Sequence, residues 1–322
     1  MPTRRKVAVV VPFLNEAENL PLLYERLSSV LAAEPEAFDV LFVDDGSSDG
    51  SAAWVAGRAA SDPHVKLLRL SRNFGHQLAI TAGMDHADGD AVVIMDADLQ
   101  DPPEVVPELL RRWREGHEIV YAVRTSRSGE PWLKLLLAAT FYKAFRRMAN
   151  VDVPLDAGDF RLVDRKVIDA LKQVRELHRF VRGLTCWVGF SQTAVHYERA
   201  PRHAGTTKYP VWKSTRLAWD AITSFSSTPL RWMTFFGLVV SIAGLLQAVR
   251  VIVDRLLYPG SMERGWASVV AIMLFLGGVQ LISLGLIGQY VGRIFEESKK
   301  RPLYFVRQKV GRFGAESDEP EP

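Results

Sequence analysis

AVVIMDADLQD, residues 91–101, sets a short apolar run directly before a cluster of acidic side chains. A run rich in Val and Ile that ends at polar residues is typical of a buried strand. In an open α/β sheet, ligands bind at the carboxyl ends of the strands. Asp96, Asp98 and Gln100 therefore lie where hard oxygen ligands can hold a divalent cation against a diphosphate.

The same Asp-x-Asp spacing occurs in Asp88-Gly89-Asp90, where no apolar run precedes it. The spacing alone is therefore weak evidence, and the position after a strand is what separates the two motifs. The alternative for Asp96 and Asp98 is a solvated loop. Their placement favours metal or diphosphate binding.

Strand and helix signals alternate through the first 125 residues, which predicts an α/β fold with a mostly parallel sheet covered by helices on both faces. Asn15 and Glu18 have the spacing of a capping box, which predicts a helix start there. Helices are expected over 75–86, from 101 onwards and over 177–188. The expected strands are 7–11, 38–43, 65–70, 91–95, 119–123 and 159–163.

Polar clusters follow three of these strands, at Pro12–Glu16, Asp44–Asp49 and Asp96–Gln100. Strand ends of a doubly wound sheet converge, so we expect the clusters to share one crevice. Glycine-rich dinucleotide and P-loop motifs are both missing. The carboxylates suit a nucleotide held through its base and ribose, by Asp44 or Asp45, with its phosphates bound through a metal. A solvated turn is the alternative for Asp44–Asp49.

Composition excludes several classes of protein. The 322 residues carry a net charge of only +3 and no basic stripe with interleaved aromatics, which argues against a nucleic-acid partner. Cys186 is the only cysteine, so an internal disulfide and a multi-cysteine metal site are excluded.

Two apolar stretches, 231–253 and 267–292, are long enough to span a bilayer as helices. A buried hairpin of helices in a soluble domain is the alternative. Basic residues precede the first stretch and follow the second, whereas the linker has few, so the positive-inside rule places both ends of the chain in the cytoplasm. We expect a multi-pass protein of the cytoplasmic membrane.

This pattern predicts five segments: a catalytic domain (1–210), a juxtamembrane segment (211–230), the two spans, and a cytoplasmic tail (293–322). The acidic end after Arg312 is expected to be disordered. Small residues in the second span could support a homo-oligomer, and they are Gly277, Gly278, Gly285 and Gly288.

Several motifs resemble family 2 glycosyltransferases, which have the nucleotide-diphospho-sugar transferase (GT-A) fold. They are VPFLNEAENL (11–20), VDDGSSDGS (43–51), the run LSRNFGHQ to PPEVV (70–106) and GDFRLVDR (158–165). The closer resemblance is to polyprenyl-phosphate glycosyltransferases, namely dolichyl-phosphate mannose synthases and bactoprenol glucosyl transferases. The ending GLIGQYVGRIFEESKKRPLYFV (285–306) is similar to the bactoprenol subgroup.

The resemblance implies roles for individual residues. Asp159 would lie near the sugar, and Thr207 replaces the serine that usually precedes the loop lysine. The positions implied for the nucleotide-sugar are Pro12, Phe13, Glu16, Asp44, Asp45, Asp96 and Ala97, and those implied for Mg²⁺ or Mn²⁺ are Asp96, Asp98 and Gln100. Arg124 and Arg127 would hold phosphate groups, and Arg202 and Lys208 would belong to the mobile loop over the donor. The implied catalytic residues are Asp98, Asp159, Arg124, Arg202 and Lys208.

Charge favours this assignment. Donor and acceptor are both anionic and repel each other, so the site must supply cations, and arginine offers a bidentate fork to phosphate. A solvated surface charge is the alternative for each basic residue, Arg127 above all. The acceptor phosphate is already ionised at neutral pH, so Asp159 is expected to position groups or bind the sugar and not to accept a proton.

The expected reaction is inverting transfer of a hexose from a nucleotide-diphospho-sugar to undecaprenyl or another polyprenyl phosphate. Subgroup resemblance favours UDP-glucose, with GDP-mannose as the competing donor. Two hypotheses compete with this reaction: a non-catalytic membrane scaffold, and a transferase that acts on a soluble saccharide. The intact acidic motif argues against the scaffold, and the apolar stretches argue against the soluble acceptor.

Overall fold

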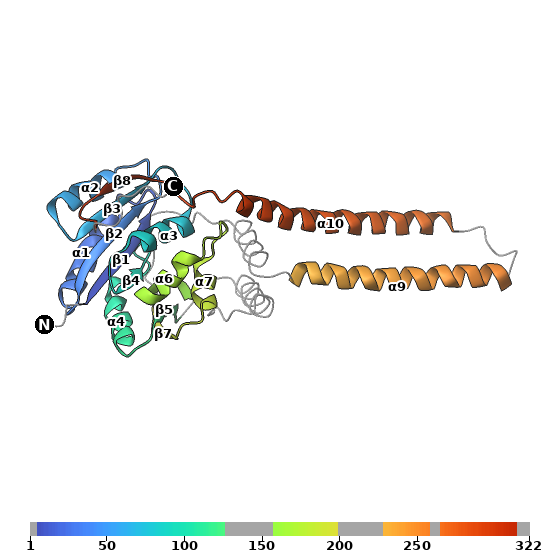
Figure 1. Ribbon diagram of the computed structural model, residues 1–322, viewed down its shortest axis with the longest axis horizontal. Helices are drawn as coiled ribbons and strands as arrows, with labels where there is room; N and C mark the ends of the chain where they lie inside the picture. The colour runs from blue at the N-terminus through green and yellow to red at the C-terminus, as the bar shows by residue number, and fades with distance from the viewer. Residues whose placement is uncertain (1–4, 126–156, 199–227, 258–264, 314–322) are drawn as a thin grey trace. The chain divides into compact units, whose positions relative to one another are not determined.

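The computed structural model describes residues 5–125, 157–198, 228–257 and 265–313 (Figure 1). The chain divides into two compact units. The first comprises Met1–Ser214 together with Pro302–Pro322, and the second comprises Thr215–Arg301.

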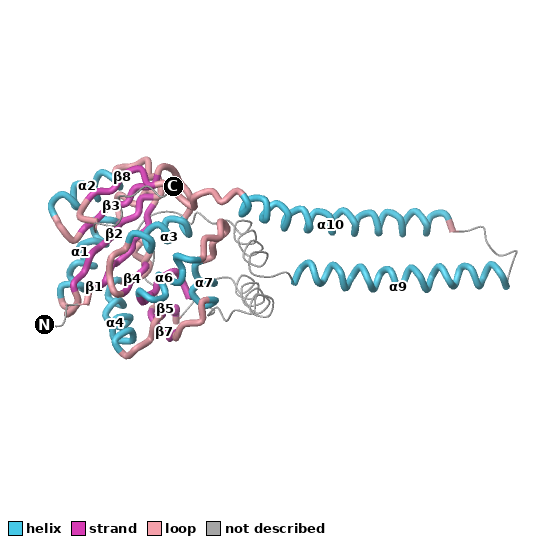
Figure 2. The backbone as a smooth tube through the Cα atoms, in the orientation of Figure 1, coloured by secondary structure: helices cyan, strands magenta, loops and turns pink. Residues whose placement is uncertain are grey.

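The described part of the first unit contains one eight-stranded sheet with the strand order β7-β5-β6-β4-β1-β2-β3-β8 (Figure 2). Four strand pairs are parallel, namely β1–β2, β1–β4, β2–β3 and β5–β7. Antiparallel pairing joins β6 to both β4 and β5, and β8 to β3. The strands are β1 (Lys6–Phe13), β2 (Ala37–Asp44), β3 (Val65–Leu70), β4 (Ala91–Ile94), β5 (Ile119–Arg124), β6 (Ala157–Asp164), β7 (Gln192–Tyr197) and β8 (Val306–Val310).

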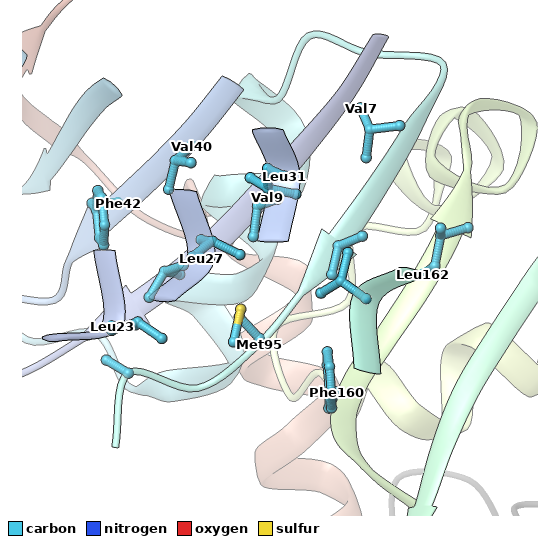
Figure 3. Packing of buried hydrophobic residues seen from close by; sticks show 14 of the residues in the cluster. Val7, Val9, Leu23, Leu27, Leu31, Val40, Phe42, Met95, Phe160 and Leu162 are labelled. Atoms are coloured by element: carbon cyan, nitrogen blue, oxygen red, sulfur yellow. The ribbon is translucent and has the colours of Figure 1, made fainter. Parts of the chain in front are cut away.

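The central strand β1 is buried on both faces, which explains its continuous apolar sequence. One face packs against α1 and α4 through Val9 and the leucines of α1 (Figure 3). On the other face α3 lies so close that a Cβ atom at Gly83 would be 2.2 Å from Val10 Cγ1. The helices of this unit are α1 (Leu20–Ala32), α2 (Ser51–Ser61), α3 (His76–His86), η1 (Pro103–Val105), α4 (Val106–Arg114), α6 (Arg165–Gln173) and α7 (Val181–Trp187).

The predicted α/β fold with a mostly parallel sheet is confirmed, and three local predictions need correction. Helix α1 begins at Leu20 and has no side-chain cap, so the predicted capping box at Asn15 is wrong. A 3₁₀ turn precedes α4, and α7 begins at Val181, four residues later than predicted. The tail contains a strand, β8, that no pattern in the sequence had predicted.

The second unit contains two long helices, α9 (Thr228–Leu257) and α10 (Trp266–Ser298). By length and composition, Thr228–Gln247 and Phe275–Ser298 are apolar enough to cross a membrane. Only 6% of each stretch is buried, unlike the core helix of a soluble protein, so these apolar surfaces need a membrane or a partner to cover them. The predicted juxtamembrane segment lies almost wholly outside the described residues.

Candidate active site

The carboxyl ends of β1, β2 and β4 lie side by side, as predicted. Strand register pairs Phe13 of β1 with Asp44 of β2. Beyond the strands, the backbone N–H of Asp45 donates to Phe13 O at 3.0 Å and that of Met95 donates to Val10 O at 3.1 Å. The sheet therefore brings the three polar clusters to one edge.

The carboxylate of Asp44 is fully buried at the end of β2. Its Oδ1 accepts from the backbone N–H of Ser47 at 2.7 Å, and its Oδ2 lies 3.0 Å from Arg69 Nε on β3. Gly46, which lies between Asp44 and Ser47 in the sequence, has a φ of +83°. A Cβ atom there would be 2.8 Å from Arg72 C. The turn after β2 thus packs directly on the backbone that follows β3.

The neighbouring carboxylate, Asp45, binds that same backbone. Its Oδ1 accepts from the N–H of Phe74 at 2.7 Å, and its Oδ2 accepts from the N–H of Gly75 at 3.0 Å. Burial raises the pKa of the Asp45 carboxyl in spite of these donors. Both acidic side chains after β2 therefore shape the site, and any contact with a nucleotide would use their remaining lone pairs.

The cluster after β1 is held by the same turn. Asn15 has a φ of 56°, and its Oδ1 accepts from the backbone N–H of Ser48 at 2.9 Å, which is the role it has in place of a helix cap. The Oε2 of Glu16 accepts from Asn19 Nδ2 at 2.6 Å. Pro12 and Phe13 are buried at the end of β1.

Beyond β4 the chain makes a tight turn through the acidic motif. Asp98 Oδ1 accepts from the backbone N–H of Gln100 at 3.2 Å. Leu99 has a φ of 61°, a left-handed conformation that costs a non-glycine residue about 1–2 kcal/mol, and its buried side chain holds it there. Ala97 is buried as well. The turn keeps Asp96 and Asp98 at the end of the strand.

Asp96 has the electrostatic setting of a ligand for a cation. Its Oδ1 is buried and accepts no hydrogen bond from the described residues, and His76 Nε2 lies 3.4 Å away. Burial, opposed by His76 and reinforced by Asp101, Asp159 and Asp98, raises the pKa of Asp96 to about 6. A bound cation would relieve this unfavourable environment.

The described residues contain no group of three His, Cys, Asp or Glu side chains preformed for a metal ion. Asp96 and Asp98 instead offer two hard carboxylates, which suits a cation that takes its other ligands from phosphate and water. The residues present therefore fit a substrate-bridging divalent cation and not a closed protein cage.

Asp159, on β6, is the centre of a buried ion network. Arg182 donates to it from Nε (2.7 Å to Oδ1) and from Nη2 (3.0 Å to Oδ2), while His76 Nε2 lies 3.1 Å from Oδ2 and Gln77 Nε2 lies 3.3 Å from it. Burial opposes ionisation, but Arg182 and His76 hold the pKa of Asp159 well below its usual value. The side chain is an anion at neutral pH.

The same network determines the charge of His76. Burial disfavours the protonated ring, but the hydrogen bond to Asp159 and the charges of Asp96 and Asp159 outweigh it and raise the pKa of His76 to about 9. The imidazolium therefore lies between the acidic motif and Asp159. It joins a residue after β4 to a residue on the antiparallel strand β6.

Arg124 ends β5 and is half-buried. Its Nε donates to Tyr197 Oη at 3.3 Å, and that hydroxyl donates to Asp101 Oδ1 at 2.6 Å. Asp101 follows directly after Gln100, so this chain of contacts links Arg124 to the acidic motif. The other guanidinium N–H groups of Arg124 are donors that suit an anionic group.

Three predicted residues, Arg127, Arg202 and Lys208, lie outside the described residues, so their roles remain predictions. Conversely, His76 and Arg182 were not predicted as site residues. His76 follows strand β3 in the sequence, so the rule that identified the other strand ends could have found it. Arg182 is the second residue of the short helix α7 and gave no comparable signal.

The second Asp-x-Asp motif has a different role, as its sequence position predicted. Asp88 and Asp90 lie before β4, where they bind Lys6 at the start of β1: Asp88 Oδ2 accepts from Lys6 Nζ at 2.7 Å and Asp90 Oδ2 from the Lys6 N–H at 2.8 Å. These carboxylates belong to the opposite end of the strands from the site.

Comparison with known proteins agrees with the resemblance in the sequence. The family model "Glycosyl transferase family 2" matches residues 8–172. The "Uncharacterized glycosyltransferase YkcC" of Bacillus subtilis is 48% identical over 94% of both chains. The "Bactoprenol glucosyl transferase" of Shigella phage SfV is 41% identical over 94% of this chain and 99% of the relative.

A crystal structure of mannosyl-3-phosphoglycerate synthase from Rubrobacter xylanophilus is also similar to this chain, with a TM-score of 0.47 and 21% identity. The similarity covers 71% of this chain and 74% of that structure's chain.

Proposed function

The chain belongs to glycosyl transferase family 2, and from that premise we propose that it transfers a glucosyl group, with inversion, from UDP-glucose to a polyprenyl phosphate such as undecaprenyl phosphate. The observation that carries the proposal is the buried Oδ1 of Asp96 at the carboxyl end of β4, which accepts no hydrogen bond from the described residues, with the cations of His76 and Arg182 nearby. Relatives named for glucosyl transfer to bactoprenol, 40–41% identical over 94% of this chain, support the choice of sugar and acceptor.

In this reaction, an oxygen of the lipid phosphate forms a bond to the anomeric carbon while the bond from that carbon to the nucleotide diphosphate breaks. The electron pair leaves with the diphosphate, so the charge that must be stabilised develops there. Asp96 and Asp98, with Gln100, would hold a Mg²⁺ or Mn²⁺ ion, which neutralises charge on the diphosphate when it is bound.

The protein's own residues would hold the reacting groups in place. Arg124 offers guanidinium donors to a phosphate, and Arg127, Arg202 and Lys208 are proposed to add positive charge. Asp159 is unsuited to accept a proton because Arg182 and His76 stabilise its anion. The reaction needs no proton acceptor, because the lipid phosphate attacks as an anion, so Asp159 is proposed to orient His76 and Arg182 around the sugar.

A lipid acceptor also accounts for α9 and α10, which are long and apolar enough to cross a membrane. The basic residues that flank the two stretches support a cytoplasmic location for the catalytic domain and the tail. We propose a multi-pass protein of the cytoplasmic membrane, with the site close to the lipid headgroups.

The experiment that tests the proposal uses purified full-length protein in detergent with undecaprenyl phosphate and Mg²⁺ or Mn²⁺. Radiolabelled UDP-glucose and GDP-mannose are supplied in parallel, and label is counted in the organic phase. Transfer from UDP-glucose alone is expected. Transfer from GDP-mannose alone would replace the donor, and transfer from neither donor by a folded protein would contradict the proposal.

A further inference from the structure

The segment Pro302–Val310, called here the return segment, follows α10 in the sequence and contains β8. It pairs antiparallel with β3 at the edge of the sheet, with Leu67 opposite Val310 and Arg69 opposite Gln308. Leu303 is buried at its start. A strand at this edge lies beside the strand that supplies Arg69 to the buried Asp44.

Phe305 contacts the loop that carries the donors to Asp45. Its backbone carbonyl accepts from the N–H of Ser71 at 2.9 Å, and its ring packs on Phe74 with centroids 6.4 Å apart. The backbone N–H of Phe74 in turn donates to Asp45 at 2.7 Å. One aromatic contact therefore separates the return segment from a residue of the candidate site.

Tyr304, also in the return segment, contacts the carboxyl end of α3. Its hydroxyl donates to Asp85 Oδ2 at 2.8 Å, and its ring packs edge-on against His86 with centroids 5.9 Å apart. Arg175 also donates to that Asp85 oxygen, at 2.6 Å. Helix α3 is thus fixed at its carboxyl end by the return segment, while His76 at its amino end reaches Asp96 and Asp159.

Phe305 is 56% exposed, so the fold does not need it to fill the core. Its large apolar side chain instead lies at the surface against Phe74, which follows the loop Ser71-Arg72-Asn73, whose polar residues are typical of turns. Fixing Phe74 and Gly75 keeps their N–H groups aimed at Asp45, and fixing α3 keeps His76 between the two carboxylates.

We propose that Tyr304 and Phe305 are positioning residues for the donor site: the return segment holds residues 71–86 in the arrangement that binds the nucleotide-sugar. The inference rests on the proposed function for its ligand. It adds that the chain directly after the second candidate membrane span helps to order the site, so donor affinity depends on the tail.

The test compares Phe305→Ala with Gln308→Ala in the full-length protein. Gln308 is exposed on β8, three residues after Phe305, and none of its contacts given by the structure reach residues 71–86, so it serves as the matched control. The first readout is hydrogen exchange of the amides in 71–76, which needs no ligand. The second is the affinity for UDP with Mn²⁺, together with KM and kcat for UDP-glucose.

Phe305→Ala is expected to speed exchange at Phe74 and Gly75 and to raise the Kd for UDP and the KM for the donor by about three- to tenfold, the effect of losing one aromatic pair. The kcat should be retained, because the reacting groups are unchanged. Phe305→Tyr should restore both exchange and affinity. Tyr304→Phe, which removes only the hydroxyl, should show a smaller change of the same kind.

The proposal would be overturned if amide exchange at 71–76 in Phe305→Ala matched that of the Gln308→Ala control. It would also be overturned if exchange in Phe305→Ala were faster but its affinity for UDP equalled that of a wild type that binds UDP. A wild-type protein that neither binds UDP nor transfers sugar would contradict the proposed function instead. In that case, faster exchange in Phe305→Ala would still show that the return segment orders the loop, but its role for this donor would be refuted.

Discussion

His76 Nε2 lies 3.1 Å from Asp159 Oδ2, so a helix that starts after β3 is joined to β6, which runs antiparallel to both of its neighbours. The ring also faces Asp96 Oδ1 at 3.4 Å. The imidazolium of His76 therefore partly neutralises the charges of Asp96 and Asp159, which the sheet brings close together.

The charge of His76 predicts how stability depends on pH in the metal-free protein. Its pKa of about 9 in the fold exceeds the ordinary value of 6.5, so its contribution to stability is complete below pH 6.5 and is lost as the pH rises through 9. The Tm difference between wild type and His76→Gln should therefore shrink between these two pH values. Thermal unfolding in EDTA measures it, and a constant difference would contradict the assigned charge.

The bidentate contact of Arg182 with Asp159 predicts a coupling between the two residues. Removing one partner of a fully buried ion pair costs roughly 3–5 kcal/mol, and since Arg182 is partly exposed we expect about 2 kcal/mol for Arg182→Met. This corresponds to a Tm lower by about 4–8 °C. The double variant with Asp159→Asn should lose less than the sum of the single losses. Additive losses would show that the two side chains act independently.

Gly46 and Gly57 form a matched pair of predictions. Alanine at Gly46 would place Cβ 2.8 Å from the backbone of Arg72 at a φ of +83°, so it should displace the loop after β3, lower the Tm and weaken UDP binding. Alanine at Gly57, inside α2 with nothing within 4 Å, should stabilise the protein by about 0.5–1 kcal/mol. Equal effects at the two positions would contradict the close packing of the turn at Gly46 on the backbone of Arg72.

The two Asp-x-Asp motifs predict opposite responses to metal. Asp96→Asn should abolish the increase in UDP affinity that Mg²⁺ or Mn²⁺ produces, because it removes a ligand charge. Asp90→Asn should keep that increase, since the Asp90 carboxylate accepts its described hydrogen bond from the Lys6 N–H at the start of β1. Calorimetric titration of UDP with and without metal makes the comparison. Loss of the metal response in both variants would mean that it does not arise at Asp96.

Much of the sheet could be predicted because its strands are buried on both faces and therefore read as continuous apolar runs. The positions of β1, β2, β3 and β4 follow from such runs, and the convergence of Asp44 and Asp96 follows from parallel order. The strand β8 was missed because VRQKV lies at an edge and alternates with charged residues. Edge strands lack the apolar signal of central ones.

The site was harder to predict where its geometry depends on tertiary contacts. Asn15 has a favourable capping spacing, yet its amide oxygen accepts from Ser48 on another turn, since the helix starts only at Leu20. His76 and Arg182 meet at Asp159 although they lie far apart in the sequence, and no local pattern records that meeting. Polar side chains at strand ends were predictable, but their partners were not.

The role of the acidic motif after β4 is decided by the transfer of label from UDP-glucose to undecaprenyl phosphate by wild type, Asp98→Ala and Asp88→Ala. Asp88 provides the control because it has the same spacing at the opposite end of the strands. We expect labelled lipid from the wild type and from Asp88→Ala, and at least about a hundredfold less from Asp98→Ala, an effect of the size that losing one oxyanion-type contact produces. Equal transfer by Asp98→Ala, or no labelled lipid from a folded wild type, would contradict this expectation.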